Sequence, residues 1–181
     1  IYKEALELKV LKVLMDKTKF FTPTKIKNFL SCKYIVYNEF YKKDLGISKK
    51  QKTKNDELRL KKGNEHEDNY FLQLKKKYKK TIDLKKNNLD YSKRFKETLM
   101  AMQDGYEVIR GGVLIQEDWV GETDFLIKTT DLKSKFGNFS YVVHETKNTK
   151  KTKVDHIIQA GIYNLMLESA QEIQPASFSI V

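Results

Sequence analysis

The sequence predicts an α/β domain with a mixed central sheet flanked by helices, and three observations support this. Before about residue 80, apolar side chains recur mainly at helical spacing. Three strand-like runs follow, at 106–117, 119–128 and 139–147, and we expect them to form an antiparallel group. A helical pattern and a strand near Ala176 complete an order that is typical of an α/β or α+β domain with a mixed sheet.

The first part of the chain predicts three helices. Residues 1–17 look helical, and a second helix is expected to begin with Thr22 as N-cap and Pro23 at its first position, and to continue to about Phe40. A third helix covers about 56–79. Its inner side chains form two neighbouring stripes, one with Glu67, Phe71, Leu74 and Tyr78 and the other with His66, Tyr70 and Leu74.

The later elements are shorter. "TIDL" (81–84) predicts a short strand, and a helix over 91–105 is expected to close at Gly105. Gly111-Gly112 predicts a bulge in the first long strand-like run. In the helix over 91–105 we expect Phe95, Leu99 and Met102 to face inward. A last helix is expected over 154–168, with an inward apolar stripe of Val154, Ile157, Ile158, Gly161, Ile162 and Leu165.

Length and composition bound the domain organisation. The 181 residues suffice for one ordinary domain, and 40% hydrophobic with 33% charged residues is a globular balance. We expect a single domain with a mainly helical part at 1–80 and a sheet core at 81–181. The chain starts without Met and stops inside an expected strand, "ASFSIV", which indicates a domain taken from a longer protein.

Composition also excludes several classes of protein. No apolar run is long enough to cross a bilayer, so no membrane partner is expected. A single cysteine, Cys32, excludes a disulfide framework and a closed cysteine-based zinc site, and it fits a reducing, cytoplasmic setting. The net charge of +11 favours an anionic partner such as nucleic acid, although a lysine-biased proteome gives the same charge without selection for binding.

Candidate chemistry begins with "YVVHETKNTK" (141–150). Side chains alternate along a strand, so Glu145 and Lys147 point to the same side. A carboxylate that holds a divalent cation beside an ammonium that positions water is an arrangement suited to metal-dependent hydrolysis. A surface ion pair explains the tripeptide equally simply when it is taken alone.

Asp124 changes this interpretation. In "WVGETDFLIK" (119–128) it adjoins the apolar Phe125, where an unpaired carboxylate would be costly. Neighbouring strands could bring Asp124 and Glu145 to one metal ion. The alternative is that Asp124 forms a salt bridge with a nearby lysine.

Other polar residues stand near these motifs. His66 on its helix is either a packed side chain or a third metal ligand, which would favour Mn²⁺ over Mg²⁺. Gln159 and Tyr163 lie one helical turn apart and form either a polar edge or a substrate clamp. The lysines that follow Asn148 form a basic loop suited to phosphate contact: Lys150, Lys151 and Lys153.

Together, these motifs resemble the PD-(D/E)xK phosphodiesterase superfamily, and specifically its RecB-like nucleases, which are often fused to a superfamily 1 helicase. The resemblance covers about 22–181. Its ordered elements are 63–67 (GNEHE), 121–126 (GETDFL), 145–147 (ETK) and the Gln159–Tyr163 pair, with 58 residues from His66 to Asp124 and 21 from Asp124 to Glu145.

The resemblance implies a restriction-endonuclease-like core and a metal-dependent deoxyribonuclease, an exonuclease acting on single strands or DNA ends in DNA repair. It implies that Mg²⁺ or Mn²⁺ is held by His66, Asp124, Glu145 and the backbone carbonyl of Thr146. Lys147 would handle the attacking water, and Gln159 and Tyr163 would contact DNA or orient Lys147. DNA and a helicase domain in the same polypeptide are the implied partners.

Two departures from the family pattern matter. Glu145 stands where close relatives often have Asp, which the superfamily pattern allows. Related CRISPR-associated exonucleases hold an iron–sulfur cluster with four cysteines, of which only Cys32 is matched, so we expect no cluster and a packed Cys32. A non-catalytic nucleic-acid-binding domain of a helicase or CRISPR-type assembly is the alternative function. Loss of Asp124, Glu145 or Lys147 would be its signature, and all three residues are present.

Overall fold

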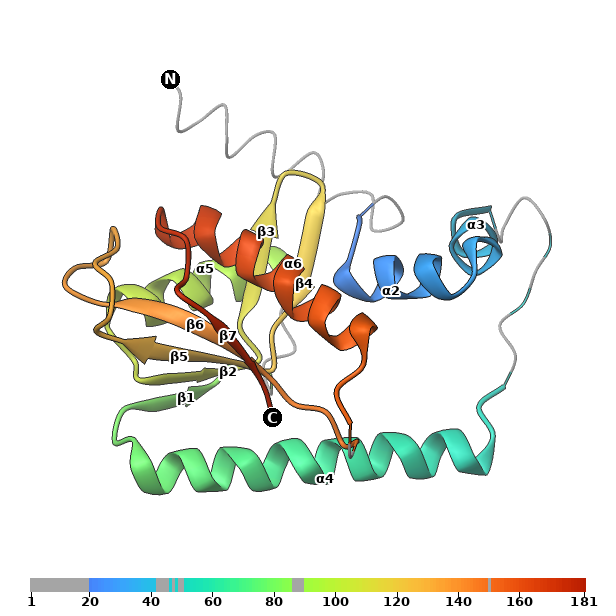
Figure 1. Ribbon diagram of the computed structural model, residues 1–181, viewed down its shortest axis with the longest axis horizontal. Helices are drawn as coiled ribbons and strands as arrows, with labels where there is room; N and C mark the ends of the chain where they lie inside the picture. The colour runs from blue at the N-terminus through green and yellow to red at the C-terminus, as the bar shows by residue number, and fades with distance from the viewer. Residues whose placement is uncertain (1–19, 42–45, 47, 49–50, 86–89, 150) are drawn as a thin grey trace.

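A computed structural model gives the fold and describes residues 20–41, 46, 48, 51–85, 90–149 and 151–181. Its centre is a five-stranded sheet of order β1-β2-β5-β6-β7 (Figure 1). The strands are β1 Thr81–Asp83, β2 Val108–Arg110, β5 Phe125–Thr129, β6 Ser140–Glu145 and β7 Phe178–Ile180. The outer pairs β1–β2 and β6–β7 are parallel and the inner pairs are antiparallel, so the predicted mixed α/β sheet is confirmed.

A separate hairpin, β3 Val113–Gln116 and β4 Trp119–Glu122, stands beside this sheet. The predicted bulge at Gly111-Gly112 is wrong, because the chain turns a corner there and leaves the main sheet. Gly111 has φ +65°, and a Cβ on it would lie 2.8 Å from the backbone nitrogen of Lys85. The chain returns at Thr123, whose N–H bonds the carbonyl of Gly112, and Asp124 follows directly at the start of β5.

Helices flank the sheet. The long α4 (Lys54–Lys77) runs along one face (Figure 1), where Phe71 and Leu74 pack on Val108, Phe125 and Ile127. Helices α5 (Tyr91–Gln103) and α6 (Val154–Gln171) lie on the other face, and α5 ends before Gly105 at φ +69°, as predicted. Within α5, Met102 is fully buried, and Phe95 and Leu99 are partly buried against core clusters.

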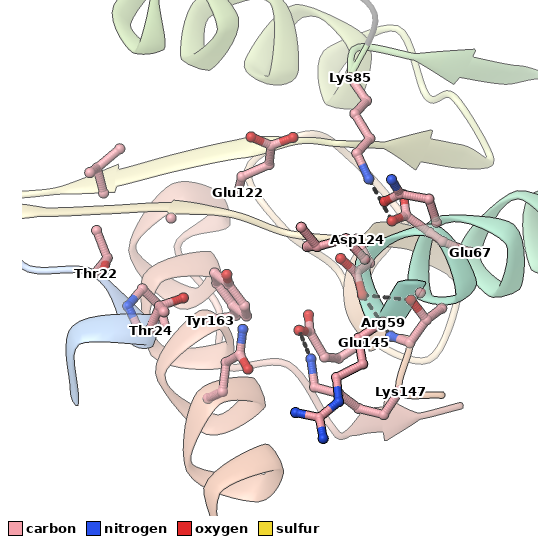
Figure 2. A pocket seen from close by; sticks show the side chains of 18 of the residues that line it. Thr22, Thr24, Arg59, Glu67, Lys85, Glu122, Asp124, Glu145, Lys147 and Tyr163 are labelled. Carbon is pink, nitrogen blue, oxygen red and sulfur yellow. Dashed lines mark hydrogen bonds and ion pairs between the residues drawn. The ribbon is translucent and has the colours of Figure 1, made fainter. Parts of the chain in front are cut away.

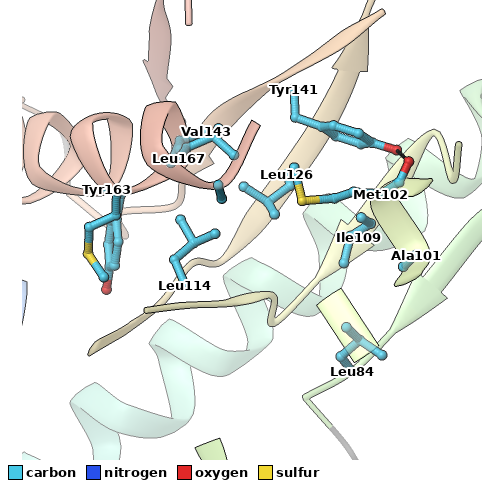
Figure 3. Close-up of a cluster of buried hydrophobic side chains, with 12 residues drawn as sticks. Leu84, Ala101, Met102, Ile109, Leu114, Leu126, Tyr141, Val143, Tyr163 and Leu167 are labelled. Carbon is cyan, nitrogen blue, oxygen red and sulfur yellow. Dashed lines mark hydrogen bonds between the residues drawn. The ribbon is translucent and has the colours of Figure 1, made fainter. Parts of the chain in front are cut away.

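The main core lies between α5, α6 and the sheet (Figure 3), and its fully buried members include Met102, Leu114, Leu126 and Tyr141. The predicted apolar stripe of the last helix is partly wrong, because Val154, Ile157 and Leu165 are exposed. The buried face carries His156, Gln159, Ala160, Tyr163, Met166, Leu167, Ala170 and Gln171.

Gly121 partly explains why α6 buries the face that carries Tyr163. A Cβ on Gly121 would stand 2.5 Å from Cε1 of Tyr163, so only glycine leaves room for the tyrosine ring against the hairpin. The packing of α6 against β3 and β6 then fixes its rotation about its own axis.

The predicted helix over 22–40 is two helices, α2 (Pro23–Ser31) and α3 (Lys33–Tyr41). Thr22 is the N-cap as predicted, and its hydroxyl accepts from the N–H of Lys25. Cys32 has extended backbone angles (φ −162°, ψ 116°) and breaks the run. It is exposed, so the prediction that it packs inside a helix is wrong. The helix predicted over 1–17 lies outside the described residues.

Within the part of the chain that the structure describes, no helix is both long and apolar enough to span a membrane.

Candidate active site

A cleft of about 940 Å³ opens where the main sheet, the hairpin, α4, α6 and the start of α2 meet (Figure 2). It brings together residues that lie far apart in the sequence. Five of its lining residues are acidic and three are basic, namely Asp56, Glu67, Glu122, Asp124 and Glu145, and Arg59, Lys85 and Lys147. Acidic side chains at the end of a sheet in a deep cleft mark a candidate active site.

Glu145 and Lys147 lie in this cleft at the end of β6. The ammonium of Lys147 donates to Oε1 of Glu145, as the strand alternation predicts. The other oxygen, Oε2, is buried and has no hydrogen-bond partner among the residues that the structure describes. Burial, together with the negative charge of Asp124, raises the pKa of Glu145 to about 7.

The backbone around Lys147 is held by the last residues of the chain. The N–H of Lys147 donates to the carbonyl of Val181 at 2.8 Å, and the N–H of Val181 donates to the carbonyl of Glu145 at 2.8 Å. These bonds extend the parallel β6–β7 pairing past the end of β6. The position of Lys147 therefore depends on β7.

Asp124 faces the cleft from the corner between β4 and β5. Its Oδ2 accepts two hydrogen bonds of 2.7 Å, from the N–H and from the hydroxyl of Thr146. Burial raises the pKa of Asp124 and these two bonds oppose the rise. The alternative considered for Asp124, a salt bridge to a lysine, is not among the ion pairs of the described residues; Thr146 is the hydrogen-bond partner of this carboxylate.

Gln159 and Tyr163 of α6 also line this cleft, where both are buried. Burial, reinforced by the charge of Glu145, raises the pKa of the Tyr163 hydroxyl, so it stays a hydrogen-bond donor at all working pH values. The structure thus brings Asp124, Glu145, Thr146, Lys147, Gln159 and Tyr163 to one place.

His66 is not brought there. It lines a neighbouring cleft with Lys147, Asn148 and Thr149, and its Nε2 lies 3.4 Å from the carbonyl oxygen of Val181. Lys151 and Lys153 are exposed and line neither cleft, and Lys150 lies outside the described residues.

Glu67 occupies the place expected for His66. It is 6% exposed, its Oε1 accepts from Nε of Arg110 at 3.0 Å, and its Oε2 accepts from Nζ of Lys85 at 2.5 Å. Its charge contributes to the raised pKa of both Asp124 and Glu145. The signal for it was present in the sequence, since Glu67 shares the inner stripe of its helix with Phe71 and Leu74.

The donors in the cleft fit a hard divalent cation. Carboxylate oxygens suit Mg²⁺ and Mn²⁺, and the unpartnered Oε2 of Glu145 is a buried oxygen that such an ion would satisfy. No group of three or more His, Cys, Asp or Glu side chains among the described residues forms a ready metal site. Proteins usually hold Mg²⁺ with one or two carboxylates, and water and substrate phosphate complete its coordination. Asp124 and Glu145 could supply the two carboxylates.

The chain was compared with protein-family models, curated proteins and solved structures. No protein-family model, no curated protein and no solved structure matches the chain.

Proposed function

We propose that the chain is a metal-dependent deoxyribonuclease of the PD-(D/E)xK superfamily, with a RecB-like, restriction-endonuclease-like core. One observation carries the proposal. Asp124, Glu145 and Lys147, from the corner before β5 and the end of β6, converge in one cleft. Carboxylates can hold the divalent cation of metal-dependent phosphodiester hydrolysis, and an ammonium beside them can offset charge on the phosphate.

In this proposal Asp124 and Glu145, with the carbonyl of Thr146, hold Mg²⁺ or Mn²⁺. The ion supplies Lewis-acid polarisation of the scissile phosphate when it is bound. Lys147 orients the attacking water and offsets charge on the phosphate. The water oxygen bonds to phosphorus, the bond from phosphorus to the 3′-oxygen breaks, and that oxygen leaves with a proton.

The unpartnered Oε2 of Glu145 supports this assignment over a surface ion pair. A buried polar atom without a partner is unusual in folded proteins and is often found at functional sites. The 2% exposure of Glu145 also sets it apart from a solvated charge at a strand end.

Nucleic acid is the proposed substrate because the net charge is +11 and the cleft is open to solvent along α4. Within that class the resemblance favours an exonuclease that acts on single strands or DNA ends, with a helicase domain as partner.

The test is cleavage of end-labelled single- and double-stranded DNA, and of matched RNA, with Mg²⁺, Mn²⁺ or EDTA. Asp124→Asn and Lys147→Met are each expected to lower the cleavage rate by about 10³-fold, the scale typical of losing a group that stabilises charge in the transition state. Matched controls are Asp131→Asn and Lys133→Met, which change the same charges at exposed positions between β5 and β6.

Cleavage that persists in EDTA, or in both site variants, would contradict the proposal. DNA binding without any cleavage would favour the non-catalytic binding domain instead. Preferential cleavage of RNA would keep the site and change the substrate.

A further inference from the structure

A second cleft of about 580 Å³ lies beside the candidate active site, between α4 and the segment after β6. It is lined by Arg59, Lys62, His66, Lys147, Asn148 and Thr149. Arg59 and Lys147 line both clefts, so the two clefts adjoin, and both residues are labelled in Figure 2.

The two clefts share two cations, Arg59 and Lys147, and differ in their carboxylates. Five carboxylates line the first, whereas the described lining of the second has three cations and no carboxylate. Within the described part of the chain, neither Arg59 nor Lys62 forms a salt bridge. Of the other lining side chains, Asn148 can donate a hydrogen bond through its amide. Nε2 of His66 lies 3.4 Å from the carbonyl oxygen of Val181, and the hydroxyl of Thr149 donates to the carbonyl of Lys151. Such a lining complements an anion.

The spacing of charged residues along α4 determines which of the two clefts each of them lines. Arg59, Lys62 and His66 are three and four residues apart, which places them on one stripe of α4. Glu67, one residue further, turns about 100° away toward the carboxylates. Helix α4 therefore presents an acidic group to one cleft and a basic stripe to the next.

We propose that the second cleft is a phosphate subsite that holds the neighbouring phosphate of the substrate strand. His66 contacts this phosphate and does not bind the metal. The inference rests on the proposed nuclease function and deepens it. A strand whose scissile phosphate lies at Asp124 and Glu145 continues past Lys147, and the next phosphate meets Arg59, Lys62 and His66. The subsite selects a backbone anion without reading bases.

The first test is the salt dependence of DNA binding in EDTA, measured by fluorescence anisotropy with a labelled oligo(dT). Each phosphate contact in single-stranded DNA adds about 0.7 to the slope of log K against log salt. The double variant Arg59→Gln/Lys62→Gln removes the contact to this one phosphate and is expected to lower the slope by about 0.7 and to weaken binding more than tenfold at low salt.

The matched control is Lys61→Gln/Lys76→Gln, which removes the same charge from the same helix at exposed positions outside the described clefts. It is expected to leave the slope unchanged. Equal slopes for the two double variants would overturn the subsite and leave the nuclease proposal standing. A wild-type chain that neither binds nor cleaves DNA would overturn both.

The second test separates a phosphate contact from a metal ligand. Mn²⁺ binding without DNA, measured by titration calorimetry, is expected to be unchanged in His66→Ala and lost in Asp124→Ala. A loss of Mn²⁺ binding in His66→Ala would overturn the role assigned to His66, whatever the DNA results.

Discussion

Two buried glutamates face the candidate active site from opposite walls, and their surroundings differ. Glu67 on α4 is 6% exposed and Glu145 on β6 is 2% exposed. Both oxygens of Glu67 accept from cations, Arg110 and Lys85. Only one oxygen of Glu145 has a partner, Lys147.

The difference separates a structural carboxylate from one that is available to a ligand. Arg110 also bonds Asp68 and Asp83 and stacks 5.2 Å from the centre of the Phe71 ring, so Glu67 ties α4 to β1 and β2. Oε2 of Glu145 has no hydrogen-bond partner in the described part of the chain, and a buried polar atom without a partner lowers stability.

The largest expected effect is on stability in the absence of metal. Glu67→Gln should lower the free energy of unfolding by about 3 kcal/mol, because it removes the buried charge that pairs with Arg110 and leaves that guanidinium with only the more exposed Asp68 and Asp83. Glu145→Gln should leave it unchanged or raise it. Urea denaturation at pH 7 in EDTA measures both. An equal loss in the two variants would remove the distinction.

The pH dependence of stability sharpens the same point. The pKa of Glu145 rises from 4.5 to about 7 on folding, so the folded protein holds this proton more tightly than the unfolded chain. Its stabilising contribution is complete below pH 4.5 and is lost as the pH rises to about 7. The loss is about 3 kcal/mol at about 1.4 kcal/mol per pKa unit.

Denaturation between pH 4.5 and 8 in EDTA checks this prediction. Glu145→Gln should remove most of the decline, and Asp124, whose pKa is also raised, accounts for a remainder of the same sign. Glu65→Gln, at an exposed position of α4, is the control. Burial lowers the pKa of His144 and His156, which makes stability rise with pH up to about 6.5, so the assignment is judged on the difference between wild type and Glu145→Gln. A difference that does not change between pH 4.5 and 8 would contradict it.

Stabilisation of the folded protein by Mg²⁺ should depend on Glu145 and not on Glu67. Mg²⁺ at ten times its Kd should stabilise the wild type by about 1.4 kcal/mol, a Tm shift of about 4 °C. The shift should vanish in Glu145→Gln and persist in Glu67→Gln. Thermal unfolding with and without Mg²⁺ measures it, and a shift that survives Glu145→Gln would place the ion elsewhere.

The smallest expected effect comes from a variant that makes the surroundings of Glu67 resemble those of Glu145. Lys85→Met leaves Oε2 of Glu67 without its cation and so imitates Glu145. The cost should be about 1 kcal/mol, because the Lys85 side chain is 37% exposed and its pairing is screened by water. A loss as large as that of Glu67→Gln would show that Lys85, and not Arg110, holds the glutamate.

The side chains that a strand end brings into the cleft could be predicted from the sequence, whereas those that a helix brings there could not. Alternation on β6 correctly places Glu145 and Lys147 together, since a strand has only two sides. On α4 the neighbours His66 and Glu67 differ by about 100°, so the rotation of the helix decides which one enters the cleft. That rotation is set by Arg110 and Phe125, which are distant in sequence.

The corner at Asp124 was equally hidden from sequence reasoning. The run 119–128 has the composition of one strand, yet it divides between the hairpin and the main sheet. The division depends on Gly111 approaching the backbone of Lys85, a contact between residues of separate elements. Likewise, α6 carries two overlapping apolar stripes, and the space beside Gly121 selects the one with Tyr163.

The pairing of β6 with β7 also has a consequence for the order in which the protein becomes competent during synthesis. Lys147 is bonded to Val181, so the ribosome must extend the chain 34 residues past the lysine before that bond can form. Until then β6 is an unpaired edge and the ammonium has no fixed backbone. A nascent chain therefore carries Glu145 and Lys147 well before the backbone bonds between β6 and the segment that ends in Val181 can form.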